Sequence, residues 1–133
     1  MIDLEYQVPI QEQSPLNLAF VGDSVLELLV RHRLAAHSRL PVGKLNALKV
    51  PMVSAHGQYK AVEAILPALT EEETGVLHRG RNASKATVAK HATVEEYRSS
   101  TGLEALLGWL FLQGRQERIQ ELFEIIWTAQ QQD

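Results

Sequence analysis

Asp23 and Glu104 are the two side chains whose positions best suit them to chemistry. In residues 17–27 apolar residues recur at helical spacing, and a helical projection places Asp23 at the edge of the apolar arc. A carboxylate there is partly removed from water, which is costly unless a cation or a metal ion partners it. A structural alternative is open, in which Gly22, Asp23 and Ser24 form a turn and Asp23 or Ser24 caps the following helix.

Glu104 lies at the margin of a second apolar stripe, in residues 101–111, and is the only acid between Glu96 and Glu117. Its structural alternative is a solvated glutamate at a helix margin. Gly108, one turn later, is less favourable than alanine in a helix by about 1 kcal/mol. We therefore expect another backbone to approach closely at Gly108. The spacing of the two carboxylates does not by itself establish a site.

The elements that must position these acids are predicted to be helices. A first helix is expected over about residues 15–36, with Ser14 as its N-cap and Pro15 at its first position. A second helical pattern runs from about residue 45 to 66, where Pro51 should kink or divide it. Thr70 opens a capping box and a short helix, which Gly80 is expected to close.

The remainder of the chain is predicted to be one loop followed by helices. Residues 81–92 have no helical stripe and are expected to form an exposed loop. A second capping box begins at Thr93, and residues 95–130 are expected to form two or three helices separated at Gly102 and Gly114. No strand alternation occurs, so the predicted fold class is all-α, a bundle of about six to seven helices.

The composition is that of a single globular domain. The chain has 133 residues, 45% of them hydrophobic and 22% charged. The absence of cysteine excludes disulfides, thiolate metal sites and cysteine nucleophiles. The N-terminus lacks the pattern of a secretion signal, and no apolar stretch approaches the roughly 20 residues of a membrane span. We therefore expect a cytoplasmic protein.

The distribution of charge indicates more than the net charge of −3. Residues 28–62 and 74–94 contain basic residues and no acid, so the fold could present one basic face to nucleic acid. The alternative is that these are ordinary solvated helix faces. The ten cations are Arg31, Arg33, Arg39, Lys44, Lys49 and Lys60 in the first block, and Arg79, Arg81, Lys85 and Lys90 in the second.

Two motifs resemble the ribonuclease III family. Phe20-Val-Gly-Asp-Ser-Val-Leu26 resembles its signature Phe-Leu-Gly-Asp-Ala-Val-Leu, and Glu104-Ala-Leu-Leu-Gly108 resembles its second acidic motif. The closer resemblance, over about residues 15–125, is to Mini-ribonuclease III, a short form without a separate double-stranded-RNA-binding domain. Its further motifs here are His78-Arg-Gly-Arg-Asn82, Thr87-Val-Ala-Lys90 and the segment from Tyr97 to Gly108. This implies one ribonuclease III-like catalytic domain over residues 1–133, with a core of about 15–128.

The resemblance implies a metal-dependent hydrolase for duplex RNA that leaves 5′-phosphate and 3′-hydroxyl ends. Asp23 and Glu104 are then the catalytic carboxylates and hold Mg²⁺. Ribonuclease III has two further acids where this chain has Ala19 and Thr101, a reduction that Mini-ribonuclease III shares. Mg²⁺ keeps several waters and commonly takes one or two protein carboxylates, so this pair can suffice for one ion. None of the five histidines offers a better catalytic group.

Several partners follow from the same resemblance. The expected substrate is precursor 23S ribosomal RNA, with a ribosomal protein as a further partner, and the expected assembly is a homodimer. The apolar surface around Ala19, Phe20 and Gly108 could take the partner's helix. Proteins read duplex RNA through its phosphates, its 2′-hydroxyls and its shape. We expect this contact at the predicted loop, through Arg79, Arg81, Asn82, Lys85 and Lys90.

Two other functions are compatible with a helical fold. One is a non-catalytic RNA-binding or ribosome-assembly module that keeps the ribonuclease III fold, against which the two desolvated carboxylates weigh. The other is an unrelated helical interaction protein, which would leave the segregation of charge unexplained.

Overall fold

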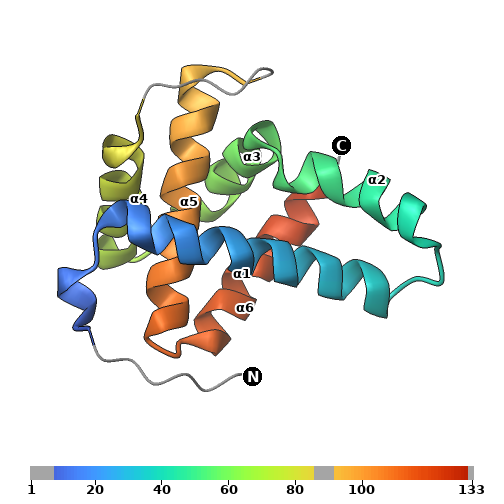
Figure 1. The fold of residues 1–133 in the computed structure, drawn as a ribbon, viewed down its shortest axis with the longest axis horizontal. Helices are drawn as coiled ribbons and strands as arrows, with labels where there is room; N and C mark the ends of the chain where they lie inside the picture. The colour runs from blue at the N-terminus through green and yellow to red at the C-terminus, as the bar shows by residue number, and fades with distance from the viewer. Residues whose placement is uncertain (1–7, 86–91, 132–133) are drawn as a thin grey trace.

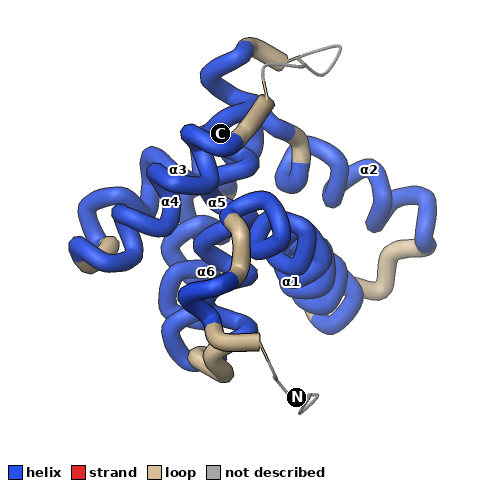
Figure 2. The backbone as a smooth tube through the Cα atoms, turned by 60° about the vertical axis from the view of Figure 1, so that its left-hand side comes forward, coloured by secondary structure: helices blue, strands red, loops and turns tan. Residues whose placement is uncertain are grey.

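Six α-helices and two short 3₁₀ helices make up the fold in the computed structural model, which describes residues 8–85 and 92–131. Helices and loops account for all of this described part, as Figure 2 shows, so the predicted all-α class is confirmed. None of the described helices is long and apolar enough to cross a membrane. In chain order the elements are η1 (Ile10–Glu12), α1 (Pro15–Ala36), α2 (Val42–Val53), α3 (Ala55–Ile65), η2 (Leu66–Ala68), α4 (Glu71–Ala83), α5 (Val94–Leu112) and α6 (Gln116–Gln130).

Helix α5 is the centre of the bundle. It packs against α1, α3, α4 and α6, and α1 crosses it in Figure 1. Every residue from Ser99 to Leu110 is buried except Glu104. Because burial of apolar side chains is the main favourable term in folding, a single acid within this run lowers stability unless a partner compensates its charge.

The helix starts follow the capping residues. The Ser14 side chain accepts a hydrogen bond from the Asn17 amide, and Pro15 occupies the first position of α1. Both predicted capping boxes form, at Thr70 and at Thr93. Since α1 is continuous from Pro15 to Ala36, a turn at Gly22-Asp23-Ser24 is excluded.

The second helical segment is divided near Pro51, as expected. The break falls after Val53, two residues beyond the proline. Pro51 lies in the last turn of α2, which ends at Val53, and Ser54 then caps α3. The Ser54 hydroxyl accepts a hydrogen bond from the Gly57 amide at 3.0 Å.

Two of the predicted glycine breaks are wrong. Gly80 lies inside α4 and Gly102 inside α5, where the two helices meet. A Cβ on Gly80 would lie 2.6 Å from the Ala105 Cβ, and one on Gly102 would lie 2.7 Å from the Leu77 carbonyl oxygen. These glycines permit a close helix contact, whereas Gly114, with φ +72°, does end α5 as predicted.

The predicted loop over residues 81–92 is therefore also wrong in part. Residues 81–83 complete α4, and Ser84 and Lys85 follow it as non-helical residues. The chain re-enters the described region at Ala92, just before α5.

Candidate active site

The site begins with two glycines at the crossing of α1 and α5. A Cβ on Gly22 would lie 1.6 Å from the Glu104 carbonyl oxygen, and one on Gly108 would lie 1.9 Å from the Leu18 carbonyl oxygen. The two backbones are thus in direct contact, and the close approach predicted at Gly108 is confirmed. Because Asp23 follows Gly22, and Glu104 lies one turn before Gly108, this crossing brings the two acids together.

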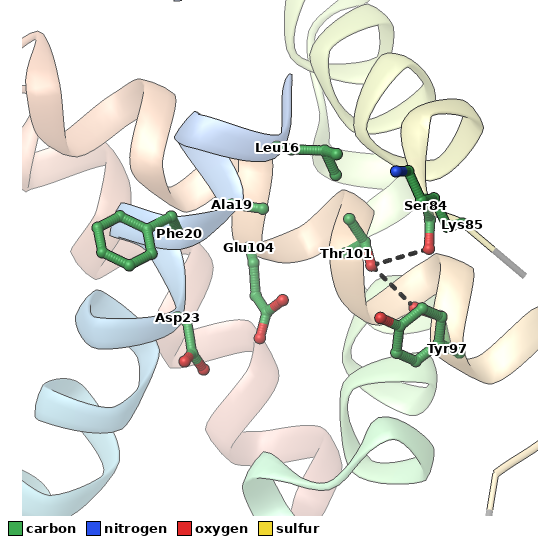
Figure 3. A pocket seen from close by; sticks show the side chains of 9 residues that line it. All are labelled: Leu16, Ala19, Phe20, Asp23, Ser84, Lys85, Tyr97, Thr101 and Glu104. Atoms are coloured by element: carbon green, nitrogen blue, oxygen red, sulfur yellow. Dashed lines mark hydrogen bonds between the residues drawn. The ribbon is translucent and has the colours of Figure 1, made fainter. Parts of the chain in front are cut away.

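The carboxylates of Asp23 and Glu104 converge from different helices, as Figure 3 shows. Asp23 is exposed, whereas Glu104 is half-buried. Burial is the largest cause that raises the pKa of Glu104, to about 8, and the charge of Asp23 raises it further. A hydrogen bond from Gln58 acts in the opposite direction, lowering the pKa of Glu104. Glu104 is thus half-buried rather than a freely solvated glutamate at a helix margin.

This donor set fits a single hard divalent cation. Within residues 8–85 and 92–131, no ion pair joins either carboxylate to a basic side chain. In the same residues, no third acid or histidine completes a larger cluster with them. Two converging carboxylates with open solvent beside them match the needs of Mg²⁺, which takes oxygen ligands and keeps much of its water.

The acids open onto a hollow of about 420 Å³ between α1, α4 and α5. Its floor and walls mix apolar, hydroxyl and charged side chains (Figure 3). The lining residues are Leu16, Ala19, Phe20, Asp23, Ser84, Lys85, Tyr97, Thr101 and Glu104. The hollow is therefore large enough to admit a phosphate group with its neighbouring sugar.

Ala19 and Thr101 line the hollow at the positions where ribonuclease III has further acids. Thr101 is buried, and its hydroxyl hydrogen-bonds with the Tyr97 carbonyl oxygen and the Ser84 hydroxyl, both at 3.2 Å. Figure 3 shows both bonds. Thr101 thus links the segment after α4 to α5, one turn before Glu104.

The residues predicted to bind RNA are not all in one place. Lys85 is exposed and lines the hollow beside the acids. Asn82 is exposed in the last turn of α4, and Arg81 there forms an ion pair with Glu95 of α5. Arg79 is exposed but lines a different hollow, with Pro15 and Trp109 among its walls, and Lys90 lies outside the described residues.

Folding also neutralises part of the first basic block. Arg31 and Lys49 both pair with Glu27, at 2.7 and 2.8 Å, so the predicted Arg31–Glu27 pair is present. Arg33 pairs with Glu124 of α6 and lies over the Phe123 ring. These cations help to join α1, α2 and α6, which leaves fewer of them available for phosphate.

The comparisons with known proteins bear on the same region. A sequence model of the Ribonuclease III domain matches residues 16–115. A protein named Mini-ribonuclease 3 from a Thermoanaerobacter species is 42% identical over 112 residues, which are 84% of this chain and 79% of that protein. Another of that name from Staphylococcus aureus is 38% identical over 117 residues, 86% of this chain and 87% of the relative. The chain belongs to the Mini-ribonuclease 3 family.

A solved structure agrees with this assignment. The crystal structure of a Fusobacterium nucleatum protein matches with a TM-score of 0.82 at 30% identity, and covers 91% of this chain and 97% of that one. As a Mini-ribonuclease 3 family member the chain is an endoribonuclease of the ribonuclease III type. Enzymes of that type depend on a divalent metal, which agrees with the donor set of Asp23 and Glu104.

Two residues at this candidate site were not among those predicted from the sequence. Tyr97 lines the hollow, and Gln58 of α3 donates a hydrogen bond to Glu104. Gln58 did leave a signal, because it is a polar residue in line with Ala61, Val62 and Ile65 on the buried face of its helix.

The raised pKa of Glu104 predicts how stability of the metal-free protein depends on pH. The neutral carboxyl is favoured in the fold, so its contribution is complete below the ordinary value of 4.5 and is lost as pH rises to about 8. Glu104→Gln cannot ionise. We therefore expect the melting temperature to fall further between pH 5 and pH 8.5 in the wild type than in this variant. Thermal unfolding followed by circular dichroism in EDTA measures both melting temperatures. An equal decrease in the two proteins would contradict a raised pKa for Glu104.

Proposed function

We propose that this chain cleaves double-stranded RNA with the help of Mg²⁺, and that Asp23 and Glu104 are the ligands of the ion. The observation that carries the proposal is the convergence of these two acids at the glycine crossing of α1 and α5. Bound Mg²⁺ would supply activation of the attacking water and neutralisation of charge on the scissile phosphate. The proposal names one ion, because Ala19 and Thr101 offer no further carboxylates.

The surrounding side chains have roles that their positions support. Asp23 is exposed and can meet an ion at the mouth of the hollow, whereas Glu104 holds it from the protein side. Lys85 on the same hollow can take a phosphate of the duplex as a point charge. The Tyr97 side chain faces the hollow in Figure 3 and can donate a hydrogen bond to a ribose or phosphate oxygen.

We extend the RNA interface along the end of α4, to Arg79, Arg81, Asn82 and Lys85, and to Lys90 beyond it. Each phosphate neutralised by the protein releases counterions, so removing such a cation lowers the salt dependence of binding. We expect Arg79→Ala combined with Arg81→Ala to weaken duplex binding and to lower the salt slope by about one for each phosphate no longer neutralised. Fluorescence anisotropy over a series of salt concentrations measures this slope.

Arg39→Ala is the matched control for this pair. Arg39 is exposed in the loop between α1 and α2. Figure 1 shows this loop on the opposite side of the molecule from α4. Its removal should leave the salt slope unchanged. A double variant of Arg79 and Arg81 with the slope of the wild type would remove the end of α4 from the RNA interface.

We also propose that the enzyme acts as a homodimer, as the family resemblance implies. Of the surface predicted to take a partner helix, Gly108 is covered within the chain by the α1–α5 contact, and Ala19 is buried at the wall of the hollow. Phe20 remains 81% exposed, and Leu28, two turns along α1, is 58% exposed. Exposed apolar side chains on one helix are a suitable surface for an isologous contact with a second copy.

The natural substrate is proposed from the family resemblance alone. We propose precursor 23S ribosomal RNA in the cytoplasm, with a ribosomal protein as an additional partner. Incubating the purified protein with total precursor RNA and mapping the new ends tests this and the activity together. Cuts in paired regions that need Mg²⁺ and carry 5′-phosphates would support the proposal. Duplex binding without cleavage of any structured RNA would favour the alternative of a non-catalytic RNA-binding module.

A further inference from the structure

Gln58 is a buried amide in the core and is hydrogen-bonded to one of the two acids. It lies in the first turn of α3 and is only 4% exposed. Its Nε2 donates hydrogen bonds to the Val53 carbonyl oxygen at 3.0 Å and to Oε2 of Glu104 at 3.3 Å. Gln58 therefore connects the α2–α3 junction to the half-buried acid of the site.

The orientation of this amide follows from the backbone around it. The Val53 carbonyl can only accept, so the nitrogen of Gln58 and not its oxygen must face it. The end of α2 is held close to α3 because Gly57 has no side chain, and a Cβ there would lie 2.1 Å from the Pro51 carbonyl oxygen. The second N–H of Nε2 is then directed to Glu104.

The bond to Glu104 engages one carboxylate oxygen and leaves Oε1 of Glu104 for another partner. A donor on Oε2 also restricts rotation of the carboxylate about its last bond. Side chains that orient a ligand in this way strengthen metal binding, and their loss typically costs about 10- to 100-fold in affinity or activity.

Packing alone is a poor reason for an amide at this position. The Oε1 atom of Gln58 is buried and has no hydrogen-bond partner within the part of the chain that the structure describes. A buried polar atom without a partner destabilises the fold, because it loses its hydrogen bonds to water and gains none in return. A methionine or leucine would fill the same space, in line with Ala61 and Ile65, without that cost.

We propose that Gln58 is a positioning residue, which holds the Glu104 carboxylate in the orientation that receives the metal ion. This rests on the proposed function, because it takes Asp23 and Glu104 as the ligands. Gln58 touches neither the ion nor the substrate in this role. It acts on the affinity of the site for metal rather than on the chemistry after the ion is bound.

The test compares Gln58→Met with Gln130→Met. Gln130 is a matched control, since its Nε2 donates to the Met52 and Gly57 carbonyl oxygens at 3.1 and 3.3 Å and its Oε1 also lacks a partner in the described chain. It braces the same α2–α3 junction without contacting Glu104. Mn²⁺ binding to the RNA-free proteins, followed by electron paramagnetic resonance, is the first readout. The Mg²⁺ concentration for half-maximal cleavage is the second.

We expect Gln58→Met to bind Mn²⁺ about 10- to 100-fold more weakly and to need correspondingly more Mg²⁺, with most of the cleavage rate restored at saturation. Gln130→Met should match the wild type in both readouts, whatever it loses in melting temperature. If Gln58→Met does not fold, Gln58→Asn keeps an amide at the junction but is too short to reach both acceptors, and the same weakening is expected.

The outcomes separate this role from the proposed function. Wild-type affinity for Mn²⁺ in Gln58→Met would overturn the positioning role and leave the metal site standing. The same loss of affinity in Gln130→Met would also overturn it, since bracing of the junction would then explain the effect. Failure of the wild type to bind Mn²⁺ would overturn the metal site itself and the role of Gln58 with it.

Discussion

Asp23→Asn is expected to abolish cleavage of duplex RNA while duplex binding persists. The substitution keeps the size of the side chain but removes one of the two carboxylates that converge at the site within residues 8–85 and 92–131. Metal-ion catalysis supplies several kcal/mol of transition-state stabilisation, so we expect the rate to fall by about 10³-fold or more. Because Asp23 is exposed on a continuous helix, the fold should not change. Single-turnover cleavage of a labelled duplex measures the rate, and anisotropy measures binding.

Glu27→Gln is the matched control for this substitution. Glu27 is the next acid along α1, one turn from Asp23, and its carboxylate is already paired with Arg31 and Lys49. Losing such partly exposed pairs costs about 1 kcal/mol or less. Its cleavage rate should therefore stay near that of the wild type. Undiminished cutting by Asp23→Asn would contradict the mechanism. An equal loss in both variants would indicate a general effect of removing negative charge from α1 on the attraction of the cation, rather than the loss of a ligand.

Gly108→Ala is expected to destabilise the protein more than any substitution at the surface. The added methyl would lie 1.9 Å from the Leu18 carbonyl oxygen and 3.0 Å from the Gly22 nitrogen, both backbone atoms that cannot rotate away. The helices must separate to admit it. Overpacking typically costs about 1–3 kcal/mol, and a clash with backbone belongs at or above the upper end of that range. Denaturant unfolding in EDTA measures the loss without any contribution from metal.

Gly43→Ala provides the comparison within the same fold. Gly43 lies in α2, and no atom lies within 4 Å of the position of an added Cβ. Alanine is favoured over glycine in a helix by about 1 kcal/mol, so this variant should be slightly more stable than the wild type. Gly108→Ala with the stability of Gly43→Ala would mean that α1 and α5 do not cross in direct contact.

These glycines also show where sequence reasoning succeeds and where it stops. The sequence predicts a close approach of another backbone at Gly108, which is correct, and helix ends at Gly80 and Gly102, which is wrong. The residue type is the same in all three cases. Only the partner helix decides whether a missing side chain makes room for packing or ends a helix, and that partner is not adjacent in sequence.

The candidate site, too, could be predicted from the sequence only in part. The sequence pattern puts Glu104 only at the margin of an apolar stripe, where a solvated glutamate is also possible, and the structure leaves it half-buried. For Asp23 the helical projection predicts a partly desolvated position, whereas the structure leaves it exposed. That the two acids converge depends on a helix crossing, and only the motifs around them indicate it. Gln58 escapes sequence reasoning because its hydrogen bonds to Val53 and Glu104 depend on how α3 meets α2 and α5.

A crystal structure with bound Mn²⁺, read by its anomalous signal, would show whether Asp23 and Glu104 together hold the ion. Mn²⁺ resembles Mg²⁺ in its preference for octahedral oxygen ligands, and its anomalous scattering identifies it without ambiguity. We expect one peak per chain, at roughly 2.1 Å from a carboxylate oxygen of both Asp23 and Glu104. A peak elsewhere in the hollow, or none at these two acids, would contradict this expectation.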